Sequence, residues 1–463
     1  MKKNIIILLI LLMLIATGCQ QNEFKLTPKE RAVNEANQTG STEVGTGWSS
    51  KENPIDAVKE AVDMALEGKT KKNPKFAIIY ATSGSNMSAI LSEAKKILGN
   101  NTQIFGGSSD SRAVMTNKGF VKAAKKGYEQ SLMEGKTGLA IMTVDSKEIT
   151  FGAGASDITA YSSPQEASKA ALADAIKNAG KSENEKPNLI LLTVTQGQEE
   201  EVLEGIEEAV GKSAIVLGGT AGGPKQSVFG KDKVYEKGIS LAVIYTDLPI
   251  GWTFEGGFDV TSPHSGIVTK VDGQAIVEID NKPALEVYDD WLDGKIEKLH
   301  KELNDSSAIR DLLTLSPLYR KYTSPSGQDY FLFSHPWPKD DTLKEKSVMT
   351  STKIKVGERV YLSQGTWETL VNRIGNLPTN AKVKAGMIVS EKPILSMGVI
   401  CAGVLGTIPE TERDKLPVLI NYADKDAPLI ATFTWGEQGH FPGVGNKHGN
   451  LLTSFVVIGD RGN

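Results

Sequence analysis

The first half of the chain alternates short apolar runs with longer amphipathic stretches. Uninterrupted apolar runs at 76–81 (FAIIYA) and 189–194 (LILLTV) are typical of buried strands. Each is followed by a stretch with apolar residues at i, i+3, i+4 and i+7, at 87–98 and 199–210. This spacing places the apolar residues on one helical face, so both regions are predicted to be strand–helix units.

A helix is also expected before each of these strands. Asn53-Pro54 and Ser163-Pro164 are typical helix starts, because Asn or Ser caps the first turn and proline fits the first helical position. After each amphipathic helix, a further apolar run leads into two glycines, in QIFGGSS (103–109) and AIVLGGTA (214–221). The whole unit is therefore repeated with a period near a hundred residues, which predicts two duplicated α/β lobes that meet at a ligand cleft.

The pattern changes after the repeat. Residues 266–279 alternate around Asp272-Gly273, which predicts a β-hairpin. A helix is expected from Pro283, and short strands separated by Gly, Pro and Asn follow Tyr330. The predicted class is α/β, and its parts are lobe one (51–158), lobe two (159–258), a bridging hairpin (259–281) and an α+β domain (282–463).

The N-terminus has the features of an export signal. Lys2 and Lys3 precede an apolar run at 5–14 that is short for a membrane span, and small residues lead into Cys19. We predict a lipoprotein signal peptide (1–18), acylation of Cys19 and a flexible tether (19–50). The protein is then exported and anchored to a membrane outside the cytoplasm. An uncleaved membrane anchor is the alternative.

Charge and cysteine content narrow the function further. The 463 residues carry a formal net charge of −4 with both signs interspersed, which excludes a basic nucleic-acid footprint. Once Cys19 is acylated, Cys401 is the one remaining thiol, so an internal disulfide is excluded.

Several stretches, in this order, resemble the FIST (F-box and intracellular signal transduction) sensory proteins. They are the repeated Gly-Gly units, GIVTKVDGQAIVEIDNKPALEVYDDWL (266–292), CAGVLGTIPE (401–410) and FTWGEQG (433–439). The resemblance implies a FIST N domain at 51–258 and a FIST C domain at 282–463. It also implies a sensory module that binds a small ligand, such as an amino acid, and has no catalysis of its own.

The chain departs from the pattern of this family in two respects. No kinase, cyclase or methyl-accepting segment precedes Asn463, so a separate membrane signalling or transport protein is the expected partner. Val404 stands where many family members have an arginine after the cysteine of the C-terminal motif, which weakens a carboxylate-binding role there.

The first candidate ligand site is the loop between the strand at 76–81 and its helix. Backbone N–H groups at a helix start favour an anion such as a ligand carboxylate. The matching loop 195–201 carries three glutamates that repel an anion, so the first lobe is expected to hold the carboxylate. Ordinary capping by Ser83 or Ser85 is the structural alternative. The loop residues are Thr82, Ser83, Gly84, Ser85 and Asn86.

The Gly-Gly turns are the second candidate set. Glycine pairs allow close approach of a ligand, and the next residue offers a hydroxyl, although a tight connection is an equal alternative. A P-loop is excluded, because GGTAGGPK has proline where that motif needs lysine. The assigned residues are Gly106, Gly107, Ser108, Ser109, Gly218, Gly219 and Thr220.

The last domain holds the remaining candidate chemistry. Its reactive residue types are Cys401, Glu410, Glu437, His440 and His448. Cys401 and Glu437 are assigned to ligand binding, and no metal or cofactor is expected. A thiol- or metal-dependent hydrolase and a ligand-free scaffold lipoprotein stay open as alternatives. The resemblance also raises a histidine-ligated haem, for which the chain offers His264, His300, His335, His440 and His448.

Overall fold

The computed structural model describes residues 42–110, 113–122, 138–303, 306–337, 345–413, 420 and 426–460. The predicted signal peptide and Cys19 lie outside the described residues. Residues 42–49, expected in the tether, form strand β1 (Thr42–Ser49). A side chain at Gly45 or Gly47 would collide with the backbone of helix α3 (Pro54–Leu66). The glycines that suggested a flexible tether therefore allow a strand to pack closely on a helix.

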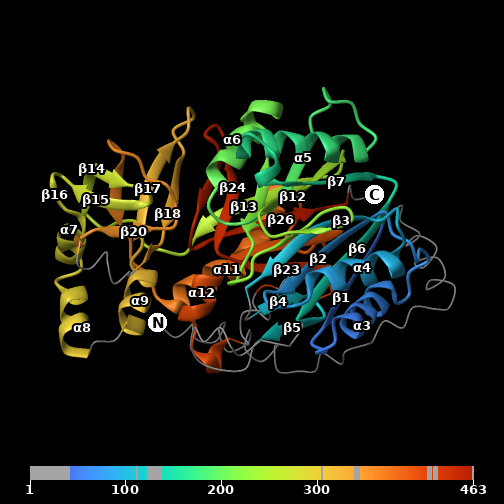
Figure 1. Ribbon diagram of the computed structural model, residues 1–463, viewed down its shortest axis with the longest axis horizontal. Helices are drawn as coiled ribbons and strands as arrows, with labels where there is room; N and C mark the ends of the chain where they lie inside the picture. Colours follow the sequence, from blue (N-terminus) through green and yellow to red (C-terminus); the bar gives the residue numbers. More distant parts are fainter. Residues whose placement is uncertain are drawn as a thin grey trace, which may run out of the picture. The chain divides into compact units, whose positions relative to one another are not determined.

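Lobe one is a six-stranded sheet in the order β1-β6-β2-β3-β10-β11. Helices α3 and α4 (Met87–Leu98) pack their apolar faces against it (Figure 1). The predicted helix start at Asn53-Pro54 is confirmed, since the Asn53 side chain accepts hydrogen bonds from the first turn of α3; α4 begins after Asn86, whose side chain accepts from the Ala89 N–H. Its strands are β2 (Phe76–Thr82), β3 (Gln103–Ser109), β6 (Leu139–Ser146), β10 (Val228–Phe229) and β11 (Val234–Tyr235).

Lobe two repeats this arrangement in the order β25-β24-β9-β8-β12-β7. Helices α5 (Pro164–Asn178) and α6 (Glu199–Val210) cover it (Figure 1). The Ser163 hydroxyl caps α5 by accepting from the Glu166 N–H, as the sequence predicts. Its strands are β7 (Ile149–Asp157), β8 (Leu189–Val194), β9 (Val216–Thr220), β12 (Gly238–Thr246), β24 (Gly436–Phe441) and β25 (Gly445–Gly449).

A third sheet of the same kind crosses the domain boundaries expected from the sequence. Its order is β13-β26-β22-β23-β4-β5, with helices α11 (Trp367–Lys384) and α12 (Ala402–Thr407). Strand β13 (Ile250–Gly256), expected to close lobe two, pairs with β26 near the C-terminus. The lobes therefore number three rather than two. The other strands are β4 (Ala113–Thr116), β5 (Gly119–Lys122), β22 (Leu395–Cys401), β23 (Leu429–Thr434) and β26 (Leu452–Ile458).

The three lobes exchange hairpins in a cycle. Hairpin β4-β5 lies between β3 and β6 of lobe one in the chain but joins β23 of the third sheet. Hairpin β10-β11 lies between β9 and β12 of lobe two but joins β3 of lobe one. Hairpin β24-β25 lies between β23 and β26 of the third lobe but joins β9 of lobe two. Each sheet is thus completed by chain from another lobe.

A separate sheet is inserted between β13 and α11. Its order is β18-β17-β21-β14-β15-β20-β19, with β16 beside β15. The predicted hairpin is confirmed, but Asp272 pairs with Ala275, so its loop is Gly273-Gln274. The elements are β14 (Ser265–Asp272), β15 (Ala275–Ile279), β16 (Lys282–Pro283), α7 (Ala284–Trp291), α8 (Lys295–Leu303), α9 (Ser306–Leu315), β17 (Leu318–Thr323), β18 (Asp329–Ser334), β19 (Pro336–Trp337), β20 (Val348–Thr350) and β21 (Arg359–Leu362).

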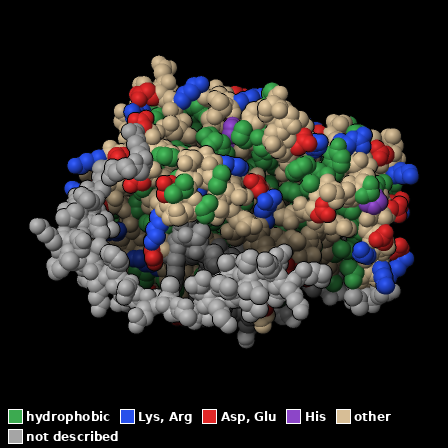
Figure 2. Space-filling model, turned by 180° about the vertical axis from the view of Figure 1, so that it is seen from behind, with side chains coloured by type: hydrophobic (Ala, Val, Ile, Leu, Met, Phe, Trp, Pro, Cys, Tyr) green, Lys and Arg blue, Asp and Glu red, His purple; other side chains and the backbone are tan. Residues whose placement is uncertain are grey.

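The three lobes share one apolar core. It is formed where the central strands begin, by Phe76 and Ile78, Leu189 and Leu191, and Leu395 and Met397. Further along, the Tyr80 hydroxyl of lobe one and the Thr193 hydroxyl of lobe two lie 2.9 Å apart. On the face in Figure 2, basic and acidic side chains are interspersed. No helix in the described part of the chain combines the length and apolarity needed to cross a membrane.

The Gly-Gly turn of lobe one gives a stability test. Gly106 has φ +131°, and a Cβ added there would lie 2.0 Å from the Ile79 carbonyl oxygen. We expect Gly106→Ala to lower the free energy of unfolding by about 2 kcal/mol more than Gly180→Ala. Gly180 is the control, because it also has positive φ but nothing lies within 4 Å of its added Cβ. Urea unfolding measures both, and equal losses would contradict the packing role of Gly106.

Candidate functional site

The ends of β3, β9 and β23 meet where the lobes join. The Gly222 N–H donates to the Ser108 carbonyl at 2.9 Å, which links lobe two to lobe one. The Asp110 N–H donates to the Phe433 carbonyl at 2.7 Å, and the Trp435 N–H to the Thr220 carbonyl at 3.1 Å. These three bonds close a ring in which each lobe donates to another. The predicted Gly-Gly turns are therefore brought together with a third strand end that the sequence did not indicate.

The Gly-Gly residues serve the junction itself. A side chain at Gly107 would meet the Ser227 carbonyl, and one at Gly219 would meet Thr434. The Ser108 hydroxyl donates to the Gly222 carbonyl at 3.1 Å, and the buried Ser109 hydroxyl accepts from the Phe433 N–H at 2.9 Å. Glycine lets the strands approach, and the hydroxyls satisfy buried backbone groups. These contacts favour the tight-connection interpretation of the turns.

The loop 82–86 is also largely occupied by internal contacts. The Thr82 hydroxyl accepts from the Gly138 N–H at 2.9 Å. The Ser83 hydroxyl accepts from the Lys225 N–H at 3.0 Å and donates to the Lys225 carbonyl oxygen at 3.1 Å. Asn86, rather than Ser83 or Ser85, caps α4. Gly84 and Asn86 remain exposed at the start of this helix.

Cys401 and Glu437 are hydrogen-bonded to each other in the third lobe, where both are buried. The Glu437 carboxyl also accepts from the Thr434 hydroxyl at 2.9 Å and the Leu452 N–H at 3.2 Å. Burial raises the pKa of Glu437 to about 8, because desolvation outweighs these hydrogen bonds. Burial, with Glu437 beside it, also raises the pKa of the Cys401 thiol well above its ordinary value. The pair favours neutral forms rather than a thiolate nucleophile.

The C-terminal histidines have other neighbours. His440 Nδ1 lies 3.1 Å from Asn446 Oδ1, and its ring meets Trp252 edge-on. His448 Nδ1 lies 2.9 Å from Gln438 Nε2. His335 Nε2 lies 2.9 Å from the Thr314 hydroxyl, and burial lowers the pKa of His335 to about 3. These three histidines therefore lie in three separate hydrogen-bonded settings.

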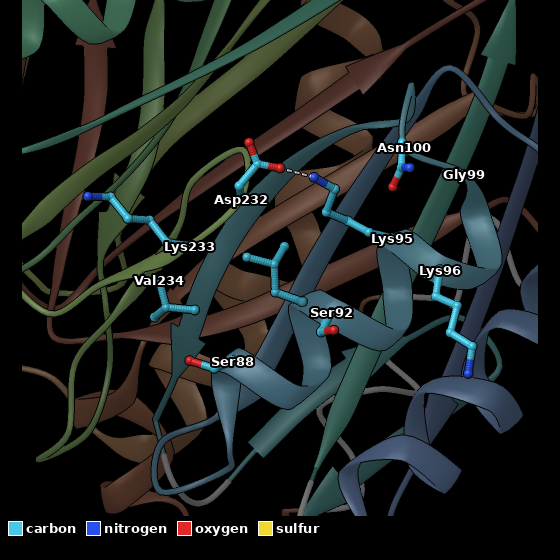
Figure 3. A pocket seen from close by; sticks show the side chains of 10 residues that line it. Ser88, Ser92, Lys95, Lys96, Gly99, Asn100, Asp232, Lys233 and Val234 are labelled. Carbon is cyan, nitrogen blue, oxygen red and sulfur yellow. Dashed lines mark hydrogen bonds and ion pairs between the residues drawn. The ribbon is translucent and has the colours of Figure 1, made fainter.

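An open pocket of about 730 Å³ lies between α4 and the β10-β11 hairpin. Figure 3 shows Ser88, Ser92 and Lys95 on α4 facing the hairpin, where Asp232 pairs with the Lys95 ammonium. That ammonium also donates to the Lys231 carbonyl at 2.9 Å. Hydrogen bonding from Lys95 lowers the pKa of Asp232, so its carboxylate stays charged at neutral pH. The wall also includes Leu91, Lys96, Gly99, Asn100, Lys233 and Val234.

Sequence reasoning missed this pocket. The polar residues Ser88, Ser92 and Lys95 are spaced at i, i+4 and i+7 on α4, and such a stripe usually indicates a solvated helix face. Asp232 lies in the turn Lys231-Asp232-Lys233, about 140 residues later in the chain. Only the exchange of the hairpin brings the two together, so no local pattern could have paired them.

One family model matches part of the chain. Residues 75–282 match the model described as FIST N domain, and FIST is a sensory domain family. The match extends beyond the predicted end at 258 and includes the β14-β15 hairpin. A FIST C domain at 282–463 stays a prediction. No curated protein matches the chain.

Solved structures show only distant likeness. A cyanuric acid hydrolase from A. caulinodans has a TM-score of 0.33 and 7% identity, covering 90% of this chain and 100% of that chain. T. maritima PurL complexed with ATP has a TM-score of 0.23 and 8% identity, and the match covers 90% of this chain and 71% of that chain. Scores this low do not establish a common fold, so neither protein informs the function here.

The raised pKa of Glu437 predicts how stability depends on pH. Its stabilising effect is fully present below pH 4.5, where the carboxyl is protonated in both states, and is lost as pH rises to about 8. We expect the wild type to lose up to about 1.4 kcal/mol per pH unit relative to Glu437→Gln in this window. Urea unfolding at pH 5, 6, 7 and 8 measures the difference, and parallel pH profiles would contradict it.

Burial of Cys401 predicts low reactivity. Native protein at pH 8 should be modified by a thiol reagent roughly a hundredfold more slowly than protein in denaturant, because the thiol is both inaccessible and neutral. The reaction is monitored by the absorbance of the chromophore that the reagent releases when it modifies the thiol. Rapid stoichiometric modification of Cys401 in the native state would reopen the thiol-hydrolase alternative.

Proposed function

We propose that the protein is a sensor whose small polar ligand binds between α4 and the β10-β11 hairpin. The observation that carries the proposal is the composition of this pocket, where lysine ammonium groups and one carboxylate line an opening with hydroxyl neighbours. The sensory family of the N-terminal segment supports a binding role. The pocket offers about 730 Å³, whereas side chains added at the buried Gly-Gly turns would collide with neighbouring strands.

Charges in the pocket favour a ligand that carries both signs. Lys95 and Asp232 contribute one charge of each sign. Lys96 and Lys233 also line the pocket, where they contact Glu93 and the Tyr235 ring. An amino acid could place its carboxylate near the lysines and its ammonium near Asp232. The Lys95–Asp232 ion pair occupies both groups in the free protein, and an amino acid would replace it with two matched ion pairs. Leu91 and Val234 add apolar surface for an aliphatic side chain.

The two walls of the pocket also suggest how binding is transmitted. Helix α4 belongs to lobe one, whereas the hairpin connects β9 and β12 of lobe two in the chain. A ligand that contacts both walls stabilises the arrangement in which they are close, and this biases the lobe geometry. We propose that a separate membrane signalling or transport protein detects the change. Acylated Cys19 would hold the sensor beside that partner, outside the cytoplasm.

Ligand binding can be tested with charge-neutral variants. The purified protein is screened by thermal shift against the common amino acids, and the best ligand is titrated by calorimetry. We expect Lys95→Gln and Asp232→Asn each to weaken binding about tenfold, because each loses about 1.4 kcal/mol of charge-assisted hydrogen bonding. Lys59→Gln is the matched control, since Lys59 is an exposed lysine on α3 and does not line the pocket.

Two outcomes would contradict the proposal. If no amino acid raises the melting temperature, the amino acid assignment fails. If a ligand binds Lys95→Gln, Asp232→Asn and wild type equally, the binding site lies elsewhere in the protein.

A further inference from the structure

Two glutamates and a histidine from distant parts of the chain converge at the start of α6. Glu199 and Glu200 open this helix, and His448 lies on β25, the hairpin strand contributed by the third lobe. Each residue offers a ligand atom, and these atoms all lie within 4.8 Å of one another. Helix α6 packs beside β25, so the two elements hold the group together.

The imidazole of His448 has one nitrogen without a partner. Its side chain is 1% exposed, and Nε2 makes no hydrogen bond within the described part of the chain. This atom lies 4.0 Å from Glu199 Oε1, which is too far for a hydrogen bond. A buried polar atom without a partner is costly, and this one lies among carboxylate oxygens. The imidazole therefore directs a buried, unbonded nitrogen toward the glutamates.

The surroundings position both residues. The Glu199 carboxylate accepts from the Thr220 hydroxyl at 2.9 Å and from the Gly197 N–H at 2.8 Å. Gln438 lies against His448 Nδ1, on the side of the ring away from the glutamates. A side chain at Gly436 would lie 2.3 Å from the imidazole, so glycine there makes room for the ring. Such contacts orient the ligands of metal sites.

One lysine lies near these carboxylates. The Lys353 ammonium pairs with Glu201, the next residue on α6, and its charge also acts on Glu200 and Glu199. Glu200 accepts from the Lys353 backbone N–H at 3.0 Å. Glu199 accepts from a hydroxyl and a backbone N–H, as described above. Three glutamates therefore share the charge of one lysine, and a cation beside the buried imidazole would compensate the remainder.

We propose that Glu199, Glu200 and His448 bind a divalent transition-metal ion such as Zn²⁺. One imidazole with two carboxylates suits this class of ion better than Ca²⁺ or Mg²⁺, which prefer oxygen ligands alone. The ion would take the lone pair of His448 Nε2, leaving the proton on Nδ1. The Gln438 amide would then turn its oxygen, which is otherwise unpartnered among the described atoms, toward that N–H. The ion would fasten the β24-β25 hairpin to lobe two.

Metal titration tests this site directly. Full-length protein without a histidine tag is stripped with a chelator and titrated with Zn²⁺ by calorimetry and with Co²⁺ by visible absorption. We expect one ion per chain, ligand-field bands with Co²⁺ and a higher melting temperature with Zn²⁺. Glu200→Gln and His448→Gln should each weaken Zn²⁺ binding at least ~10-fold, because each removes a ligand.

Matched variants separate a bound ion from an ordinary ion pair. Glu204→Gln, an exposed position on α6, and His300→Gln, an exposed position on α8, should bind Zn²⁺ as the wild type does. Glu200 is half-buried, so its variant tests the site even if the change at buried His448 prevents folding. Absence of stoichiometric Zn²⁺ and Co²⁺ binding would overturn the proposal and leave a His448–Glu199 ion pair. Unchanged affinity in Glu200→Gln would overturn it too.

Discussion

The close approach of three strand ends is the constraint on which the rest of this structure depends. Backbone hydrogen bonds from Gly222 to Ser108, from Asp110 to Phe433 and from Trp435 to Thr220 join the lobes in a ring. Each lobe then sends its hairpin onto the sheet of another lobe. No lobe can complete its sheet alone, so formation of one sheet requires the others. The glycines at the ends of β3 and β9 permit this approach, because a side chain there would collide with a neighbouring strand or hairpin.

The hairpin exchange also determines where chemistry can occur. Around the strand ends, burial makes neutral side chains favourable, as the raised pKa of Glu437 and of Cys401 shows. Charged residues instead gather where an exchanged hairpin meets a helix of the receiving lobe. The β10-β11 hairpin forms the lysine-rich pocket with α4, and the β24-β25 hairpin brings His448 to the start of α6. These two places are the same kind of contact in successive lobes.

This arrangement suits a sensory domain. A ligand or ion at a contact between a hairpin and a helix touches chain segments from two different lobes, so its binding energy can shift their relative geometry. The shared apolar core at the other end of the strands resists such movement, because its side chains from all three sheets are closely packed. Local adjustment is therefore expected at the hairpins rather than within the core.

The sequence by itself determined the local elements and the class of the fold. Helix α6 and strand β8 have the predicted bounds, and the caps at Asn53 and Ser163 form as expected, because capping and apolar periodicity act within one turn or strand. The third lobe was not apparent, since the inserted sheet separates β13 from its partners and Ala431-Thr432 replaces the Gly-Gly pair. Strand β1 was hidden by glycines that are also common in flexible linkers.

For the candidate sites, too, the sequence determined one part and the tertiary structure the other. The residue types of the Gly-Gly turns and of the α6 start were visible along the chain, but their neighbours were not. Only the tertiary structure placed Asp232 opposite Lys95 and His448 opposite Glu199, because each pair is joined by a hairpin exchanged between lobes. Pairing between strands distant in sequence depends on the packing of whole lobes, and it cannot be predicted from the local periodicity of apolar residues.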